Sequence, residues 1–340
     1  MTTTAELIAA HQYRTPTTRK NLYNGVALNI NSNGAGKTTF TQNWPKGPAI
    51  YGLAMTFTFT LTAGTASGPI TDGILNYISQ ILFQGDNNEI FIDNVSARAL
   101  MMGPSIVQNG TVPNFDQIAA TSGTYVVTCR VNFADPRSVR PADTFIDTRR
   151  YSSMKLTITL GSLSDLFTNP GTASMTGTIS IGVLQSQKDL PKGLTTIGYP
   201  SYFFAPYEDV TEQTYIDLVR AEDVWYKRLY IQAASAGGGA WEGPNDDSIV
   251  DTVTLSSTDE TWENGTVWTD LQNENKDQYN LESVMTGRVV IDFMSDLSNK
   301  SALFSMRNNL KLSWVNDAGV AAGDTVSVLC ESYRSLRNAA

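Results

Sequence analysis

A shortage of histidine and cysteine sets the first limits on what this chain can do. Among 340 residues there are one histidine, His11, and two cysteines, Cys129 and Cys330. A single imidazole excludes catalytic triads and zinc sites built on several histidines, and two thiols supply neither a disulfide framework nor a four-cysteine zinc site. Both cysteines alternate with valines in strand-like stretches, so we interpret them as buried core thiols.

The chain also lacks long apolar runs. No stretch of 18 apolar residues is present, which predicts that no helix spans a membrane. The first ten residues, MTTTAELIAA, have neither the basic start nor the apolar run of a signal peptide. Charged residues make up only 17% of the composition, and threonine, serine, asparagine and glycine are prominent in their place. This mixture favours β-strands joined by many turns over helical bundles.

Alternation of apolar and polar residues predicts an all-β fold. Residues 53–62 read LAMTFTFTLT, and residues 124–133 repeat the period of two, which is typical of strands with one buried face. Further strands are predicted at 154–160, 177–185, 224–232, 249–255, 286–293, 308–315 and 324–332. Short helices are predicted near the N-terminus and at 71–82, 135–147, 209–218 and 294–302.

A linker at residues 186–200, which contains two prolines and two glycines, divides the chain near its middle. We therefore predict three parts. These are an N-terminal helix with a basic arm (1–20), a first β-sandwich (21–190) and a second β-sandwich (191–340).

A weak internal repeat supports two similar halves. Strands and their order recur between the halves, although the loop lengths differ. The recurring strands are 124–133, 153–160 and 176–184 in the first half, and 287–293, 309–315 and 323–330 in the second.

Charge is distributed unevenly along the chain. Residues 1–170 carry a net charge of +2, and residues 171–340 carry −11. Residues 242–282 contain eleven acidic residues and one lysine, and we interpret them as an exposed acidic loop. The acids singled out in this loop are Asp246, Asp247, Asp251, Asp259, Glu260 and Glu263. Such asymmetry predicts two differently charged ends of the molecule.

The first twenty residues have the opposite charge. Arg14, Arg19 and Lys20 stand against a single acid, Glu6. We interpret this segment as a short capped helix followed by a basic arm. A solvated tail without a role is the alternative.

One segment is similar to a phosphate-binding loop. Residues 33–39 read NGAGKTT, but Asn31 occupies the position where that motif needs its first glycine. The residues that follow contain two prolines and no helical period. A helix N-terminus that could hold phosphate is therefore not expected, and a glycine-rich hairpin turn explains the segment better.

The acids and tryptophans allow two other kinds of site. The acids of 242–282 could bind structural calcium or hydrolyse glycosides, although their spacing matches no EF-hand. The tryptophans could form a platform that stacks on sugars, although Trp225 and Trp314 fall inside predicted strands. The tryptophans considered are Trp225, Trp241, Trp262, Trp268 and Trp314.

The chain resembles the double jelly-roll major capsid proteins of tailless icosahedral viruses, especially membrane-containing bacteriophages of the tectivirus and corticovirus type. The resemblance lies in the duplicated strands of 124–184 and 287–330, the mid-chain linker, the length, and the N-terminal helix and arm. It implies two jelly-roll β-sandwiches in tandem. It also implies that three chains form a pseudo-hexameric trimer that tiles the capsid.

The resemblance also implies partners and a location. The expected partners are further copies of the chain, neighbouring capsomers, minor capsid and vertex proteins, and an internal membrane or the genome. The arm with Arg14, Arg19 and Lys20 would contact the membrane or genome, and residues 242–282 would face outward. We expect a place in the virion capsid, assembly in the host cytoplasm, no enzymatic activity, no cofactor apart from a possible structural calcium, and no small-molecule substrate.

Two alternatives from other classes stay open. One is a carbohydrate-binding or glycan-cleaving β-sandwich, which the tryptophans and acids allow. The other is a phage receptor-binding spike, which is also rich in β-structure.

Overall fold

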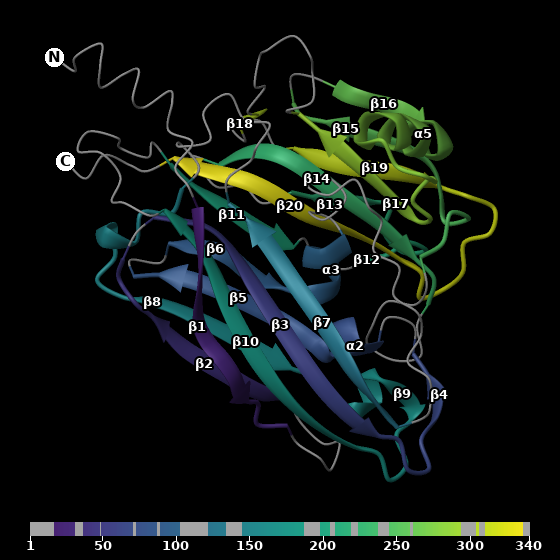
Figure 1. The fold of residues 1–340 in the computed structure, drawn as a ribbon. Coiled ribbons are helices and arrows are strands. Elements are labelled where there is room, and N and C mark those ends of the chain that lie inside the picture. Colours follow the sequence, from purple (N-terminus) through teal and green to yellow (C-terminus); the bar gives the residue numbers. More distant parts are fainter. Residues whose placement is uncertain are drawn as a thin grey trace, which may run out of the picture.

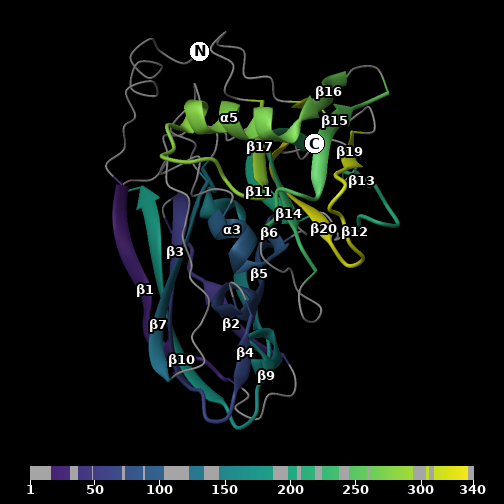
Figure 2. The same ribbon diagram turned by 90° about the vertical axis from the view of Figure 1, so that its right-hand side faces the viewer.

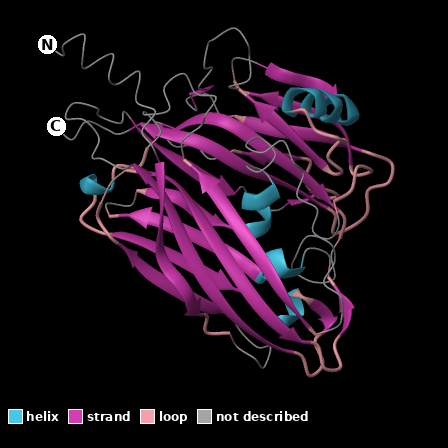
Figure 3. Cartoon of the chain, viewed as in Figure 1, coloured by secondary structure: helices cyan, strands magenta, loops and turns pink. Residues whose placement is uncertain are grey.

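A computed structural model of the chain consists mostly of antiparallel β-strands (Figures 1 and 3). The strands form three large sheets and a two-stranded ribbon of β4 (Ser67–Pro69) with β9 (Phe167–Asn169). The structure describes residues 17–30, 37–47, 49–70, 73–86, 89–102, 122–133, 145–186, 198–204, 208–218, 224–236, 245–258, 261–293, 304–305 and 310–335. The expected N-terminal helix, Arg14, and the helix expected at 294–302 lie outside these residues.

The first half of the chain forms a jelly roll. Its strands divide between two sheets, with the orders β1-β10-β3-β7 and β2-β8-β5-β6. Each sheet therefore combines strands from the start and the end of this half, as jelly rolls do. The strands are β1 (Thr17–Ala27), β2 (Thr38–Trp44), β3 (Ile50–Thr62), β5 (Ile78–Gly85), β6 (Ile90–Val95), β7 (Gly123–Asn132), β8 (Met154–Leu160) and β10 (Ser174–Ser186).

The second half repeats this topology strand for strand. Its orders are β11-β20-β14-β17 and β13-β19-β15-β16. The strands are β11 (Gly198–Phe204), β13 (Tyr215–Asp217), β14 (Val224–Ala234), β15 (Val250–Ser256), β16 (Thr261–Val267), β17 (Arg288–Asp292), β19 (Lys311–Asn316) and β20 (Thr325–Ser335). Two short strands, β12 (Glu208–Asp209) and β18 (Phe304–Ser305), pair with β20 and β14.

The predicted duplication therefore has a structural basis. β7, β8 and β10 of the first roll hold the same places in its sheets as β17, β19 and β20 hold in the second. The first roll ends with Ser186 and the second begins with Gly198. Residues 187–197 lie outside the described part of the chain, so the boundary at residue 190 stays a prediction.

A single ten-stranded sheet runs through both rolls. It has the order β17-β14-β20-β11-β6-β5-β8-β2, with β12 and β18 attached beside it. The sheet forms because β6, at the edge of the first roll, pairs in parallel with β11, at the edge of the second. Figure 2 shows the two rolls meeting along this sheet, with β1, β10, β3 and β7 in an outer layer.

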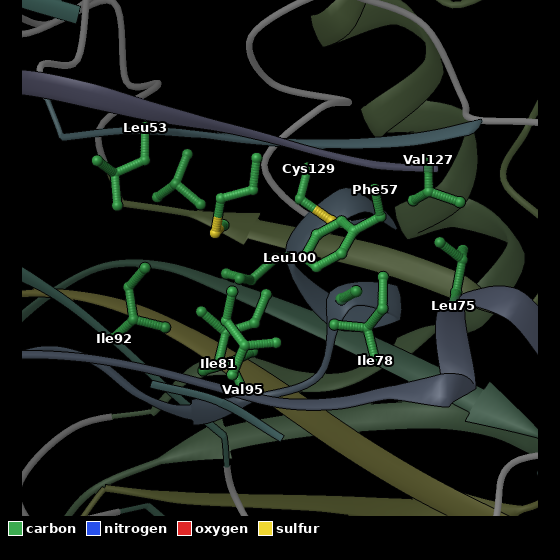
Figure 4. Packing of buried hydrophobic residues seen from close by; sticks show 14 of the residues in the cluster. Leu53, Phe57, Leu75, Ile78, Ile81, Ile92, Val95, Leu100, Val127 and Cys129 are labelled. Carbon is green, nitrogen blue, oxygen red and sulfur yellow. The ribbon is translucent and has the colours of Figure 1, made fainter. Parts of the chain in front are cut away.

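The core of the first roll follows directly from the alternation in β3. Leu53, Phe57 and Val127 are at most 3% exposed and point from β3 and β7 toward the facing sheet (Figure 4). Ile81 and Ile92 meet them from β5 and β6. Burying a large apolar side chain stabilises the fold by about 1.5–3 kcal/mol, so the threonines between these residues are left on the outward face.

Two of the expected helices are strands instead. In the segment 71–82, α2 (Gly73–Tyr77) ends after five residues and β5 follows it at once. The β-pairing wins because Ile78, Ile81 and Phe83 complete the core between β6 and β8. In the segment 209–218, β12 and β13 pair with β20 and β19. Their short length hid the strand period.

The other helices occupy the connections between the sixth and seventh strands of each roll. These helices are α3 (Ala97–Met102) in the first roll and α5 (Trp268–Tyr279) in the second. The helix expected at 135–147 falls almost wholly outside the described residues. Within its end and just beyond it the structure contains a 3-10 turn at Thr148–Arg150.

The interpretation of residues 242–282 as a loop is wrong. Within this segment lie all of β15, β16 and α5. Its apolar residues explain why: Val253, Leu255 and Leu271 are buried in the core of the second roll. Acidic residues occupy the exposed positions between them, so high charge coexists with regular structure.

The ends of both rolls lie at one end of the molecule. Thr17, at the start of β1, pairs with Ser186, at the end of β10. Gly198, at the start of β11, pairs with Ser335, at the end of β20. Since β6 and β11 run parallel, these ends coincide (Figure 1). We call this the terminal end of the molecule.

Candidate functional site

The junction of the rolls is held by a buried tyrosine. Tyr202 on β11 lies opposite Ile92 on β6, and Phe203 lies opposite Asp93. Tyr202 is fully buried, and its hydroxyl donates to the backbone carbonyl of Asn132, at the end of β7, over 2.9 Å. A side chain from the second roll thus satisfies a backbone group of the first, which joins the rolls into one unit.

The outward face of the β11-β20-β14-β17 sheet is buried against the first roll. Tyr230, Val290 and Leu329 stand opposite one another in register and are at most 6% exposed. They belong to the hydrophobic cluster of the first roll, whereas the intervening Leu229 and Val328 belong to that of the second. Both faces of this sheet are therefore covered.

A charged cluster lies buried on the same sheet. Glu331 accepts from the Lys227 ammonium at 3.0 Å and from the Arg228 guanidinium at 3.1 Å. Arg228 also donates to Asp292 at 2.9 Å. These side chains are at most 6% exposed. Two cations and two carboxylates balance, which offsets the cost of taking the charges out of water.

A tyrosine hydroxyl completes each carboxylate of this cluster. Tyr230 donates to Glu331 and Tyr279 donates to Asp292, both over 2.8 Å. Burial, followed by the nearby Glu331 carboxylate, raises the pKa of Tyr230 well above its ordinary value. The hydroxyl therefore remains a donor at any physiological pH.

A backbone irregularity brings the two cations together. Neighbouring residues of a strand normally point to opposite faces. The pairing of β14 with β20 shifts register between Tyr226 and Arg228, so Lys227 and Arg228 both reach Glu331. This is the local bend and redirected side chain that a β-bulge produces.

The outward face of the β1-β10-β3-β7 sheet has a different character. Thr58 lies between Val126 and Thr178 in register, and the rows beside it consist mostly of threonine and serine. Val126 is 62% exposed, the most exposed large apolar side chain in the described part of the chain. This face is thus flat, uncharged at its centre, and uncovered within one chain.

The predicted basic arm ends earlier than expected. Arg19 and Lys20 belong to β1, where they pair with Leu184 and Val183 of β10, and both side chains are exposed. The guanidinium of Arg19 lies over Gly182, at a place that a Cβ atom would occupy. Both residues are therefore fixed near the terminal end of the first roll, and only residues before Thr17 precede the strand.

Asp247 organises the second roll. Its Oδ1 accepts from Trp268 Nε1 at 3.2 Å, from Gln272 Nε2 at 2.6 Å and from the Gly287 backbone N–H at 2.6 Å. Gly287 has a φ of +61°, and a Cβ there would lie 2.5 Å from the backbone nitrogen of Asp246. This carboxylate ties α5 to the residues before β17.

The remaining singled-out acids are dispersed. Asp246 accepts from Ser248 and Ser235, and the hydrogen bond from the Ser248 side chain lowers its pKa most. Asp251 is exposed on β15. Glu263 lies near the opposite end of that strand, where it accepts from Thr266 over 2.6 Å.

These positions do not form a metal site. Asp259 and Glu260 lie outside the described residues. Within the described ranges, no group of three or more histidine, cysteine or acidic side chains could hold a metal ion. Nor do those ranges include a helix long and apolar enough to cross a membrane.

The tryptophans do not form a sugar-stacking platform where the structure describes them. Trp268 is 1% exposed and Trp314 is 5% exposed. Their indole nitrogens donate to Asp247 and Asn316. The side chains of Trp225, Trp241 and Trp262 lie outside the described residues.

The other motif-like residues have structural roles. Cys129 and Cys330 are fully buried, and burial raises the pKa of the Cys129 thiol to about 12. The core interpretation of both cysteines is therefore confirmed. Residues 38–44, after the glycine-rich segment, form strand β2, so the helix that a phosphate-binding loop requires does not follow.

Sequence analysis missed the buried charged cluster. Its members lie inside otherwise apolar strands, in VWYKRLYIQ, RVVID and VSVLCES. Charged residues that interrupt a buried strand are rarely left unpaired. That interruption was the signal, although it does not reveal which residues pair.

Comparison with known proteins gives matches of structure alone. No family model and no curated protein matches the sequence. The STIV MCP superimposes with a TM-score of 0.66 at 14% identity, over 94% of this chain and 97% of that one. The major capsid protein P2 from bacteriophage PM2 gives 0.57 at 12%, over 95% and 99%. The Faustovirus major capsid protein gives 0.56 at 8%, over 98% and 93%.

The chain has the double jelly-roll fold of viral major capsid proteins. Coverage of more than nine-tenths of both chains means that the tandem arrangement is shared, not just one roll. The fold class expected from the sequence is confirmed. The double jelly roll also places the surfaces described above on its two equivalent halves.

Proposed function

We propose that this protein is a structural subunit of an icosahedral viral capsid. Three copies would assemble as a pseudo-hexameric capsomer, since each copy contributes two rolls of one topology. The observation that carries the proposal is the double jelly-roll fold, shared over almost the whole chain with several major capsid proteins. Neighbouring capsomers and minor capsid or vertex proteins would be its other partners, in the virion and, during assembly, in the host cytoplasm.

The described residues favour this role over the two alternatives. A sugar-binding protein would need exposed aromatic side chains, whereas Trp268 and Trp314 are buried. A glycosidase would need two convergent carboxylates, whereas Asp247 and Glu263 lie toward opposite ends of β15. A catalytic role and a cofactor, structural calcium included, are therefore not part of the proposal.

We further propose that the terminal end faces the capsid interior. Residues 1–16, with Arg14, would extend from there toward an internal membrane or the genome, next to exposed Arg19 and Lys20. Each base beside an anionic surface contributes about 1 kcal/mol, and many chains add up through multivalency. Asp246 and Asp247 support this polarity because Asn245, just before them, pairs with Ala234 at the other end of β14.

Sedimentation velocity on the purified full chain, followed by negative-stain imaging, tests the capsid role. We expect a species of three times the monomer mass, and larger assemblies at high protein concentration. A chain that stays monomeric at micromolar concentrations and binds oligosaccharides would overturn the proposal.

Deleting residues 2–16 tests the role of the arm. Trimers should remain, because β1 is left complete, but closed and filled particles should become rare. Normal packaging by the shortened chain would refute an inward-facing arm.

A further inference from the structure

The two rolls treat equivalent faces differently. In the second roll, Tyr230 and Leu329 on the outward face of the first sheet are buried in the cluster of the neighbouring roll. In the first roll, the equivalent outward face carries Thr58 and Thr178, with Val126 62% exposed. One face has a partner inside the chain, and its counterpart has none among the described residues.

The partner of the covered face is one edge of the first roll. β6 pairs with β11, and the end of β7 receives the Tyr202 hydroxyl. From α3, Arg98 donates to Asn245 at 3.3 Å, close to where Asn245 pairs with Ala234 of β14. The edge formed by β6, α3 and the end of β7 thus reaches across the outward face of the second roll.

The second roll has the same edge without an occupant among the described residues. β16 takes the place of β6, and α5 takes the place of α3. β16 is paired only with β15. Two valines on this edge are exposed: Val267, at the end of β16, by 41%, and Val284, after α5, by 38%.

Charge complements shape on these two surfaces. The four strands β1, β10, β3 and β7 contain no acidic residue, and their exposed cations are Arg19, Lys20 and Arg130. The β16–α5 edge carries an excess of acids, with a single base, the half-buried Lys276. Its exposed acids are Asp270, Glu274, Asp277 and Glu282.

We propose that the β16–α5 edge of one copy docks on the outward face of the β1-β10-β3-β7 sheet of a second copy. The contact repeats between chains the relation that joins the two rolls within a chain. Its two surfaces differ, so it is heterologous and closes into a ring when the rotation allows. This inference rests on the proposed capsomer and names the surfaces that form it.

The face is large enough for this role. Four strands about 4.8 Å apart, each about ten residues long at ~3.3 Å per residue, cover roughly 600 Å² before side-chain relief. Stable interfaces bury about 800 Å² on each partner. The contribution of side chains and of the β1 edge brings the face to that scale.

Three single substitutions test the proposal by sedimentation velocity. Val126→Asp places an acid on the face that meets the acidic edge, and Val284→Lys places a base on the edge that meets the basic face. Val315→Asp is the matched control, because Val315 is 57% exposed on the separate β13-β19-β15-β16 sheet. Circular dichroism and thermal melting of each variant verify that it folds.

We expect each of the first two variants to weaken trimer formation at least tenfold, and the control to leave it unchanged. A mixture of the two variants should form one-to-one dimers, because each retains the surface that the other lacks. Trimers of Val126→Asp at wild-type affinity, or a mixture that stays monomeric, would overturn the proposed contact. If the unaltered chain never trimerises, the proposed capsomer itself fails.

Discussion

Replacing Glu331 by glutamine removes the central charge of the buried cluster while preserving its shape. Lys227 and part of Arg228 then lose their carboxylate partner at positions only 2–3% exposed. Breaking a buried ion pair on one side costs about 3–5 kcal/mol, a large share of the roughly 5–15 kcal/mol by which domains are stable. We therefore expect Glu331→Gln to be among the most damaging conservative changes in the chain.

Urea unfolding followed by intrinsic fluorescence measures this loss. With a denaturant slope of about 2–3 kcal/mol per molar, the midpoint should fall by at least ~1 M urea. Arg149→Gln is the control, because its ion pair with Asp147 at 2.8 Å lies at a 43% exposed side chain. Exposed pairs contribute under about 1 kcal/mol. Equal midpoints for the two variants would refute the account of the cluster.

Three further outcomes are expected. Cys129 and Cys330 should resist thiol reagents in the native state and react only on unfolding, because both are buried and their pKa values are raised; native labelling would contradict their core placement. Asp246→Asn should destabilise the protein at neutral pH, and the difference from wild type should vanish in acid, because a lowered pKa contributes stability that is lost as pH falls through it; a difference that persists at pH 2 would contradict this. Gly287→Ala should lower the melting temperature, since its φ of +61° and close neighbours exclude a side chain; an unchanged melting curve would contradict this.

The fold class could be predicted because buried and exposed residues alternate along long strands. β3 and β7 extend beyond the predicted stretches by a few residues at most, and the repeat identified three pairs of equivalent strands. Short strands escaped because three residues such as Tyr215–Asp217 do not establish a period. At residues 73–85 the local signal was helical, and pairing with β6 and β8 overrode it.

The functional surfaces were harder to predict than the fold. The composition of 242–282 indicated its charge correctly but not that β15, β16 and α5 bury its apolar residues. Asp247 looked like a surface acid, yet it accepts three hydrogen bonds from groups 21 to 40 positions further along the chain. The uncovered threonine face could not be predicted either, because exposure of Val126 depends on what the second roll covers.

The measurement that tests the central claim most directly is single-particle cryo-electron microscopy of the purified oligomer. The account predicts a threefold ring of six jelly rolls, in which the β1-β10-β3-β7 face of each copy lies against the next copy. A twofold dimer that pairs identical surfaces, or particles of one chain only, would contradict it.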